Sequence, residues 1–134
     1  MMLLDTLVLS ELRKSRPAPK VLAWLKMQQA KQLFVSVVSL GEIECGIVKV
    51  HKADAAFAER LTLWLEDTML LYSDHILPVT AAIARRWGRL SAELGHEGAD
   101  LLIAATALEN GLTVATRNVR HFKPSGISLV NPFS

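Results

Sequence analysis

Four oxygen-bearing polar side chains lie beside the ends of apolar segments in this sequence. Asp5 ends the run MLLD, and Glu42 lies six residues past the run LFVS. Asp100 immediately precedes the run LLIAATAL, and Asn118 follows the run LTVAT. Three carboxylates within a few ångströms repel one another, so each takes up a proton unless a cation compensates. Oxygen ligands favour hard cations such as Mg²⁺ or Mn²⁺, and such a cation suits phosphodiester hydrolysis because it lowers the pKa of an attacking water.

Each acid also has an ordinary structural explanation. Asp100 suits the start of a helix, where a carboxylate interacts favourably with the helix dipole, and Glu42 suits a solvated helix face. Asp5 is different because a charge at the end of an apolar strand, against the start of a helix, is costly without a partner. The residue types alone therefore leave both interpretations open.

The predicted secondary structure gives these residues a common location. Strand-like composition occurs at residues 2–5, 33–36, 76–79, 112–116 and 127–130. The segment 76–79 is predicted to be an edge strand because Pro78 cannot donate to a strand ladder. Strands that alternate with helices favour a parallel sheet covered on both faces, with functional groups beyond the carboxyl ends of its strands.

Helices are predicted between these strands from the spacing of apolar residues. Apolar positions three and four residues apart predict amphipathic helices over 40–50, 57–71 and 83–94. The run 101–108 is apolar all round, which predicts a helix buried on most sides that ends at Asn110 and Gly111. Shorter helices are predicted at 7–14 and 18–30.

Composition restricts the class of protein. A chain of 134 residues, 51% of them hydrophobic, suits one domain, and a net charge of +2 is compatible with nucleic acid without being diagnostic. The single cysteine, Cys45, excludes an internal disulfide, favours a cytoplasmic location and is predicted to be buried. No apolar run reaches the roughly 18–20 residues that span a bilayer, so no membrane partner is expected.

Four stretches of the sequence carry a resemblance to a known family. They are LLDTLVLSEL, SVVSLGEIECGI, DLLIAATALENGLTVATRNVRHF and LVNPF. Together they resemble the PIN-domain ribonucleases, and more closely the VapC/FitB-type toxins of bacterial type II toxin–antitoxin pairs. The resemblance covers essentially the whole chain. It implies a single PIN domain over 1–134, with a three-layer α/β/α fold around a central, mostly parallel sheet of four to five strands.

The same resemblance implies an activity and a set of site residues. The activity is that of a Mg²⁺- or Mn²⁺-dependent endoribonuclease. Asp5, Glu42 and Asp100 match the acids that hold the metal, and Asn118 matches a fourth catalytic position. Thr6 and Thr116 are implied as supporting residues. From the sequence itself, Arg117 and Arg120 flank Asn118 and are candidates for contacts with RNA phosphates.

The resemblance also implies partners. These are an RNA substrate, with transfer RNA or ribosomal RNA as candidates, and a cognate VapB-like antitoxin. A homodimer is implied, with a heterotetramer or larger assembly when the antitoxin is bound.

The chain departs from the family pattern at several positions. Leu7 stands where asparagine is usual, and His121 stands where aspartate is often found. The segment LGHEGAD, which ends at the predicted metal-binding Asp100, is shorter than usual. Gly98 and Ala99 stand directly before Asp100, where more apolar residues are usual.

The departure at Leu7 keeps one alternative open, a catalytically weakened PIN domain that mainly binds its antitoxin and regulates transcription through it. A nuclease acting on DNA and a nucleotide phosphatase are further alternatives.

Overall fold

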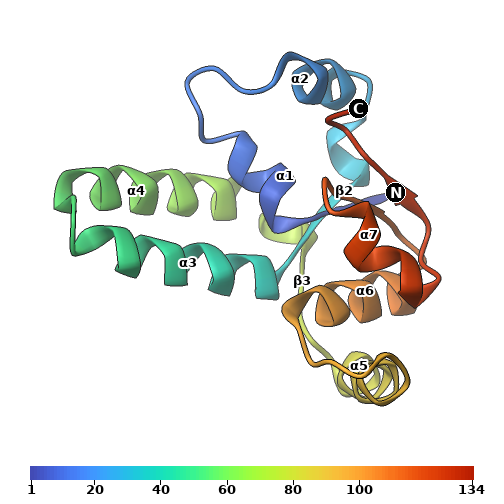
Figure 1. Ribbon diagram of the computed structural model, residues 1–134. Coiled ribbons are helices and arrows are strands. Elements are labelled where there is room, and N and C mark those ends of the chain that lie inside the picture. The colour runs from blue at the N-terminus through green and yellow to red at the C-terminus, as the bar shows by residue number, and fades with distance from the viewer.

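The computed structural model describes residues 1–134 as a central sheet with helices on both faces (Figure 1). The strands are β1 (Met2–Leu4), β2 (Leu33–Ser36), β3 (Ile76–Leu77), β4 (Thr113–Ala115) and β5 (Leu129–Val130). The α-helices are α1 (Thr6–Glu11), α2 (Pro19–Lys26), α3 (Val37–His51), α4 (Ala55–Leu71), α5 (Ala81–Leu94), α6 (Ala99–Asn110) and α7 (Val119–Phe122). Three short 3₁₀ helices are η1 (Ala30–Gln32), η2 (Ser73–His75) and η3 (Lys123–Ser125).

The five strands form one sheet in the order β3-β2-β1-β4-β5, and every neighbouring pair is parallel. Leu4 of β1 is opposite Val35 of β2 on one side and Ala115 of β4 on the other. β3 pairs only with β2, so the predicted edge position of the segment around Pro78 is confirmed. The predicted α/β fold with a parallel central sheet is therefore confirmed.

The alternation of side chains along β1 divides the protein into three layers. Leu3 and Leu4 are both fully buried, and neighbouring residues of a strand point to opposite faces of the sheet. Leu3 packs in a cluster with residues of α6 and with Phe122 of α7. Leu4 packs in a second cluster with residues of α1, and partly buried residues of α2 and α3 lie against it. The central strand is thus covered on both faces, as a parallel sheet requires.

Helix α6 is the most deeply buried helix, as its all-round apolar sequence predicts. Six of its residues are buried, among them Leu101, Ile103 and Ala107. It ends where predicted, at Asn110, because Gly111 adopts a left-handed conformation with φ of 65° that caps the helix. This helix delivers Asp100, in its first turn, toward the carboxyl edge of the sheet.

Several details differ from the predictions. The helix predicted over 7–14 ends at Glu11, and the strand predicted over 127–130 begins only at Leu129. The helix predicted over 18–30 is shorter, and α2 ends at Lys26 with Gln28 bonded back to the Trp24 carbonyl. Cys45 is exposed, and the prediction that it is buried is wrong. The reason is its place on α3, whose buried residues include Ser39 and Ile47. Residue 45 lies about 200° around the helix from Ile47 and therefore on the outer face.

Helices α3 and α4 form an antiparallel pair that extends away from the sheet (Figure 1). A small core of Ile47, Ala58 and Leu65 holds the pair together. No helix of the protein combines the length and the apolar character that crossing a membrane demands.

A buried glutamate joins α1 to the start of α2. Glu11 is only 6% exposed. Its Oε1 accepts a hydrogen bond from Lys14 Nζ at 2.8 Å, and its Oε2 accepts one from the backbone N–H of Ala18 at 3.2 Å. The bond from Lys14 is the main reason that the pKa of Glu11 lies below its ordinary value of 4.5, in spite of burial. Glu11 thus fixes the loop that contains Pro17 to the end of α1.

We expect Glu11→Gln to lower the melting temperature at pH 7 by several degrees, because it removes the charge that Lys14 and the Ala18 N–H stabilise. A lowered pKa contributes stability above the unfolded value, and that contribution disappears as the pH falls through the folded pKa. The difference between the two proteins should therefore shrink below about pH 4, which thermal denaturation across pH 3–7 would measure. A difference that stays constant over this range would contradict the assignment.

Candidate active site

The carboxyl ends of β1 and β4 form the point where the chain connections diverge. From β1 the chain passes through α1 toward β2, and from β4 it passes through α7 toward β5, on the other side of the sheet. α1 contributes to the core on one face and α7 to the core on the other. In open parallel sheets such a divergence leaves a crevice where ligands bind. Asp5 and Thr116 are the residues that follow these two strands directly.

Asp5 is held firmly at this point. It is 3% exposed and caps the N-terminus of α1, with its Oδ1 accepting from the Thr6 backbone N–H at 2.8 Å. Its Oδ2 accepts from the hydroxyl of Thr116 at 2.8 Å. The same hydroxyl oxygen accepts from the backbone N–H of Asn118 at 2.9 Å. Asp5, Thr116 and Asn118 therefore form one connected hydrogen-bond chain across β1 and β4.

Glu42 reaches the same region from α3. The Thr6 hydroxyl donates to Glu42 Oε1 at 2.6 Å, and the Thr6 Oγ1 lies 2.8 Å from the hydroxyl oxygen of Ser39. Ser39 is fully buried one turn before Glu42 on the same helix. Ser39 was not predicted as a site residue, and its only signal in the sequence is its spacing of three residues from Glu42.

Asp100 approaches from the first turn of α6. Its Oδ2 lies 3.2 Å from Nδ1 of His121, which belongs to α7. The side chain of Asp100 is 28% exposed and that of His121 is 66% exposed, so the pair sits at the solvent side of the site. The histidine that departs from the family pattern therefore contacts one of the predicted acids directly.

Electrostatics shows that the three acids share one region. The pKa of Asp5 is raised above its ordinary value of 3.8, mainly because burial disfavours the charged carboxylate. The hydrogen bonds from Thr116 and Thr6 oppose that shift, whereas the negative charges of Asp100 and Glu42 add to it. The site is thus a buried carboxylate with two further carboxylates near enough to repel it.

The donor chemistry of this region fits a hard divalent cation. Asp5, Glu42, Asp100 and the two threonines offer only oxygen atoms, and the carboxylates together lack compensating positive charge. In this arrangement no group of three His, Cys, Asp or Glu side chains could hold a metal ion. Each carboxylate instead accepts from a protein group: Asp5 from two, Glu42 from Thr6 and Asp100 from His121.

The remaining predicted residues lie around this cluster. Asn118 joins it through its backbone N–H. Arg117 is exposed, and its guanidinium carbon lies 4.8 Å from the centroid of the Phe133 ring. Arg120 is exposed on α7. The structure therefore brings the three acids, Thr6 and Thr116 together, whereas the two arginines lie at the solvent-facing margin.

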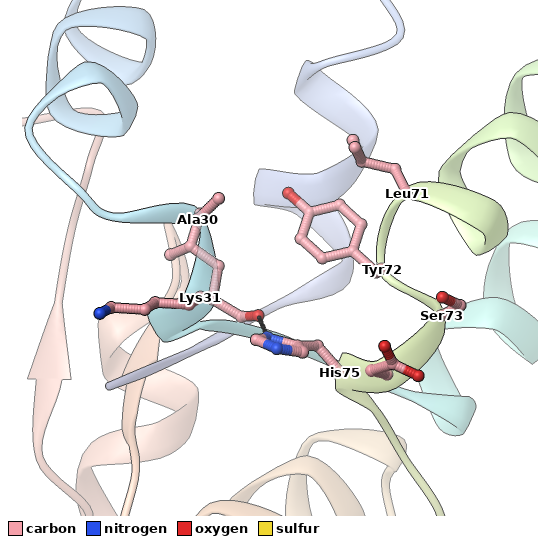
Figure 2. A pocket seen from close by; sticks show the side chains of 8 residues that line it. Ala30, Lys31, Leu71, Tyr72, Ser73 and His75 are labelled. Atoms are coloured by element: carbon pink, nitrogen blue, oxygen red, sulfur yellow. Dashed lines mark hydrogen bonds between the residues drawn. The ribbon is translucent and has the colours of Figure 1, made fainter.

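A second hollow lies away from the acids, near the start of β2 (Figure 2). Tyr72 and His75 line it, and His75 Nδ1 lies 2.8 Å from the carbonyl oxygen of Leu33 while its ring stacks on Phe34. Burial raises the pKa of Tyr72. None of the predicted site residues lines this hollow, and His75 has a structural partner.

Comparisons of the sequence and of the structure with known proteins agree on one family. The sequence profile of the PIN domain matches residues 2–125. The chain is 32% identical to VapC ribonuclease Y4jK of Sinorhizobium fredii, over 99% of this chain and 98% of that protein. It is 30% identical to toxin FitB of Neisseria gonorrhoeae, over 99% of both. A solved structure of FitAB bound to the IR36 DNA fragment superposes with a TM-score of 0.86 at 29% identity, covering 100% of this chain and 96% of that one.

We expect Asp5→Asn to raise the melting temperature at pH 7, because the variant removes a charge that burial disfavours and that Asp100 and Glu42 also repel. Asparagine caps a helix as well as aspartate does, so the bond from the Thr6 N–H is kept. A raised pKa means that Asp5 binds a proton more readily in the folded state than in the unfolded state. The stability of the wild type therefore falls as the pH rises from the unfolded pKa of Asp5 through its folded pKa. The advantage of the variant should therefore disappear toward about pH 4, which thermal denaturation across pH 4–8 would measure. A lower melting temperature for the variant at pH 7 would contradict the electrostatic argument.

Proposed function

The chain belongs to the PIN domain family, and on that premise we propose that it is a metal-dependent endoribonuclease, the toxin of a type II toxin–antitoxin pair. The observation that carries the proposal is the carboxylate of Asp5, whose pKa is raised mainly by burial and further by the charges of Asp100 and Glu42. A protein tolerates such a cluster of like charges where function requires it, and perturbed carboxylates concentrate at functional sites. We infer that residues 1–134 act as one PIN domain.

In the proposed site, Asp5, Glu42 and Asp100 hold a divalent cation and Asn118 assists them. When bound, the cation would neutralise charge that develops on the scissile phosphate and lower the pKa of the attacking water. Thr116 and the Thr6 N–H fix both oxygens of Asp5 by hydrogen bonds.

The supporting residues set the positions of the other two acids. The Thr6 hydroxyl orients Glu42, and His121 holds the outer oxygen of Asp100. Arg117 and Arg120 are both exposed, which supports the proposal that they attract RNA phosphates.

The identity of the cation follows from the same chemistry. PIN-domain ribonucleases depend on divalent metals, and an oxygen-only donor set favours Mg²⁺ or Mn²⁺ over zinc. We propose Mg²⁺, with Mn²⁺ as the alternative.

The proposed partners follow from the relatives. A structural relative is a FitAB assembly bound to DNA, which supports a cognate antitoxin for this chain and a homodimer that forms a heterotetramer or larger complex with it. A groove of about 240 Å³ lies between α1, α3 and α4, and its lining includes Thr6, Glu42, Phe57 and Trp64. We propose that a segment of a VapB-like antitoxin occupies it and covers the acids. The proposed substrate is cytoplasmic RNA, with transfer RNA and ribosomal RNA as candidates.

The alternative of a catalytically weakened domain is not favoured. A relative that matches nearly the full length of the chain is named a ribonuclease. Leu7, which prompted the alternative, is 45% exposed and takes no part in the hydrogen bonds that hold Asp5. Its replacement of the usual asparagine therefore leaves the contacts of Asp5 intact.

We expect purified protein with Mg²⁺ or Mn²⁺ to cleave RNA, and Asp5→Asn to lose activity by about 100-fold or more, because a catalytic cation contributes several kcal/mol. Gel analysis of cleavage would measure this on RNA, single-stranded DNA and nucleotides in parallel. Glu42→Gln should behave like Asp5→Asn. Glu44→Gln is the matched control, because Glu44 is exposed two residues away on the same helix. Equal activity of wild type and Asp5→Asn, or a preference for DNA or nucleotides, would refute the proposal.

Metal binding should be detectable without any activity. We expect millimolar Mg²⁺ or Mn²⁺ to raise the melting temperature of the wild type, since a ligand of the folded state stabilises it by about 2.7 kcal/mol at a concentration of 100 Kd. The shift should be much smaller for Asp5→Asn and unchanged for Glu44→Gln. Differential scanning fluorimetry with and without EDTA would measure it, and equal shifts in all three proteins would exclude Asp5 as a ligand.

A further inference from the structure

A positively charged pocket, distinct from the hollow near β2 and from the groove between α1, α3 and α4, opens near the acids at the carboxyl edge of the sheet. It has a volume of about 140 Å³ and lies between α1 and the segments that follow β4 and β5. Its lining includes Leu7, Glu11, Arg13, Lys14, Arg117 and Phe133. Arg117 is the one cation among these that the sequence made a candidate for phosphate contact. Lys14 pairs with Glu11, and neither Arg13 nor Lys14 has an assigned role toward RNA.

Two residues that line the pocket lie close in sequence to the acid site. Leu7 lies two residues after Asp5 on α1, and Arg117 directly follows Thr116, whose hydroxyl bonds to Asp5. The pocket therefore lies in the crevice created where the connections of β1 and β4 diverge.

The charged side chains that line the pocket have partners in the fold. Glu11 is nearly fully buried and accepts from Lys14 Nζ at 2.8 Å. Arg117 lines the same pocket, and its guanidinium carbon lies 4.8 Å from the centroid of the Phe133 ring. Arg13 is exposed. Three cations and one carboxylate thus line the pocket, and only Lys14 is paired with that carboxylate, which leaves an excess of positive charge.

Resting on the proposed ribonuclease function, we infer that this pocket binds a backbone phosphate of the RNA adjacent to the phosphate that is cleaved. Arg13, Lys14 and Arg117 supply the charge-assisted hydrogen bonds, and Leu7 and Phe133 form the apolar walls that hold the cations in place. Under this assignment Leu7 belongs to a substrate subsite.

Size and charge favour a phosphate as the occupant. The pocket is well below the roughly 300–1,000 Å³ that small-molecule sites occupy, so it suits a tetrahedral anion. Guanidinium groups match phosphate oxygens in geometry, and a polyanionic substrate at the acid site must present its neighbouring phosphates close to it. A positive pocket also offsets the repulsion between RNA and the three carboxylates.

The test compares the double variant Arg13→Gln/Lys14→Gln with Lys49→Gln/Lys52→Gln. Both remove two exposed cations, and neither Lys49 nor Lys52 lines this pocket. Binding of a fluorescein-labelled 12-nucleotide single-stranded RNA is measured by fluorescence anisotropy in EDTA over a series of salt concentrations. Cleavage of the same RNA is measured with Mg²⁺, and melting temperatures confirm that both variants are folded.

We expect the Arg13/Lys14 variant to bind RNA about tenfold more weakly, with KM raised and kcat nearly unchanged. The slope of log affinity against log salt should fall by about 0.7 for each phosphate of the single strand that the variant no longer neutralises. The control variant should keep the wild-type slope. After the cleavage site is mapped, a neutral methylphosphonate at the neighbouring position should weaken wild-type binding and leave the variant unaffected.

The outcomes separate this inference from the proposed function. If the wild type cleaves RNA, Asp5→Asn does not, and the Arg13/Lys14 variant matches the control in affinity, salt slope and KM, the phosphate subsite is wrong and the nuclease stands. If the wild type cleaves no RNA at all, the proposed function fails. If the variant keeps wild-type RNA binding and loses only antitoxin binding, the phosphate inference is overturned, and that loss is explained by Arg13, which also lines the groove between α1, α3 and α4.

Discussion

The burial of the Asp5 carboxylate at the end of β1 is the constraint on which the arrangement of this protein depends. A carboxylate that is 3% exposed needs hydrogen-bond donors, and it obtains them from Thr116 after β4 and from the backbone of Thr6 at the start of α1. These bonds fix the distance between two neighbouring strands and the direction in which α1 leaves the sheet. The free energy that burial of Asp5 costs is offset by the packing of Leu3 and Leu4 on the two faces of the same strand.

The hydroxyl of Thr6 extends this arrangement to a third element. It bonds to Glu42 and lies beside Ser39, so that α3 is tied to the start of α1. Asp100 is brought in separately by α6, which is held in place by its own burial. The three acids therefore come from three elements, and each is positioned by a different kind of interaction.

At the carboxyl edge of the sheet, the acids around Asp5 are separate from Glu11 and its cationic partner. Glu11, on the same helix that Asp5 caps, is paired with Lys14 and has a lowered pKa, whereas Asp5 has no cationic partner and a raised one. The two acids lie six residues apart in sequence and have opposite electrostatic roles. One neutralises cations and supports the fold, and the other carries unbalanced charge that a divalent cation would satisfy.

The sequence by itself determined the architecture and the identity of the acids. Local patterns of apolar and polar residues predicted the five strand segments, the buried helix ending at Asn110 and the acids beside strand ends. They could do so because apolar periodicity and strand-end chemistry are local properties. Only the tertiary structure decided what each side chain meets. Two features join segments far apart in the chain: the contact of His121 with Asp100, and the pocket that includes Leu7, Arg13 and Phe133. Two others, the burial of Ser39 and the exposure of Cys45, depend on which face of a helix is covered. Such contacts depend on how the layers pack, and local sequence patterns do not specify that packing.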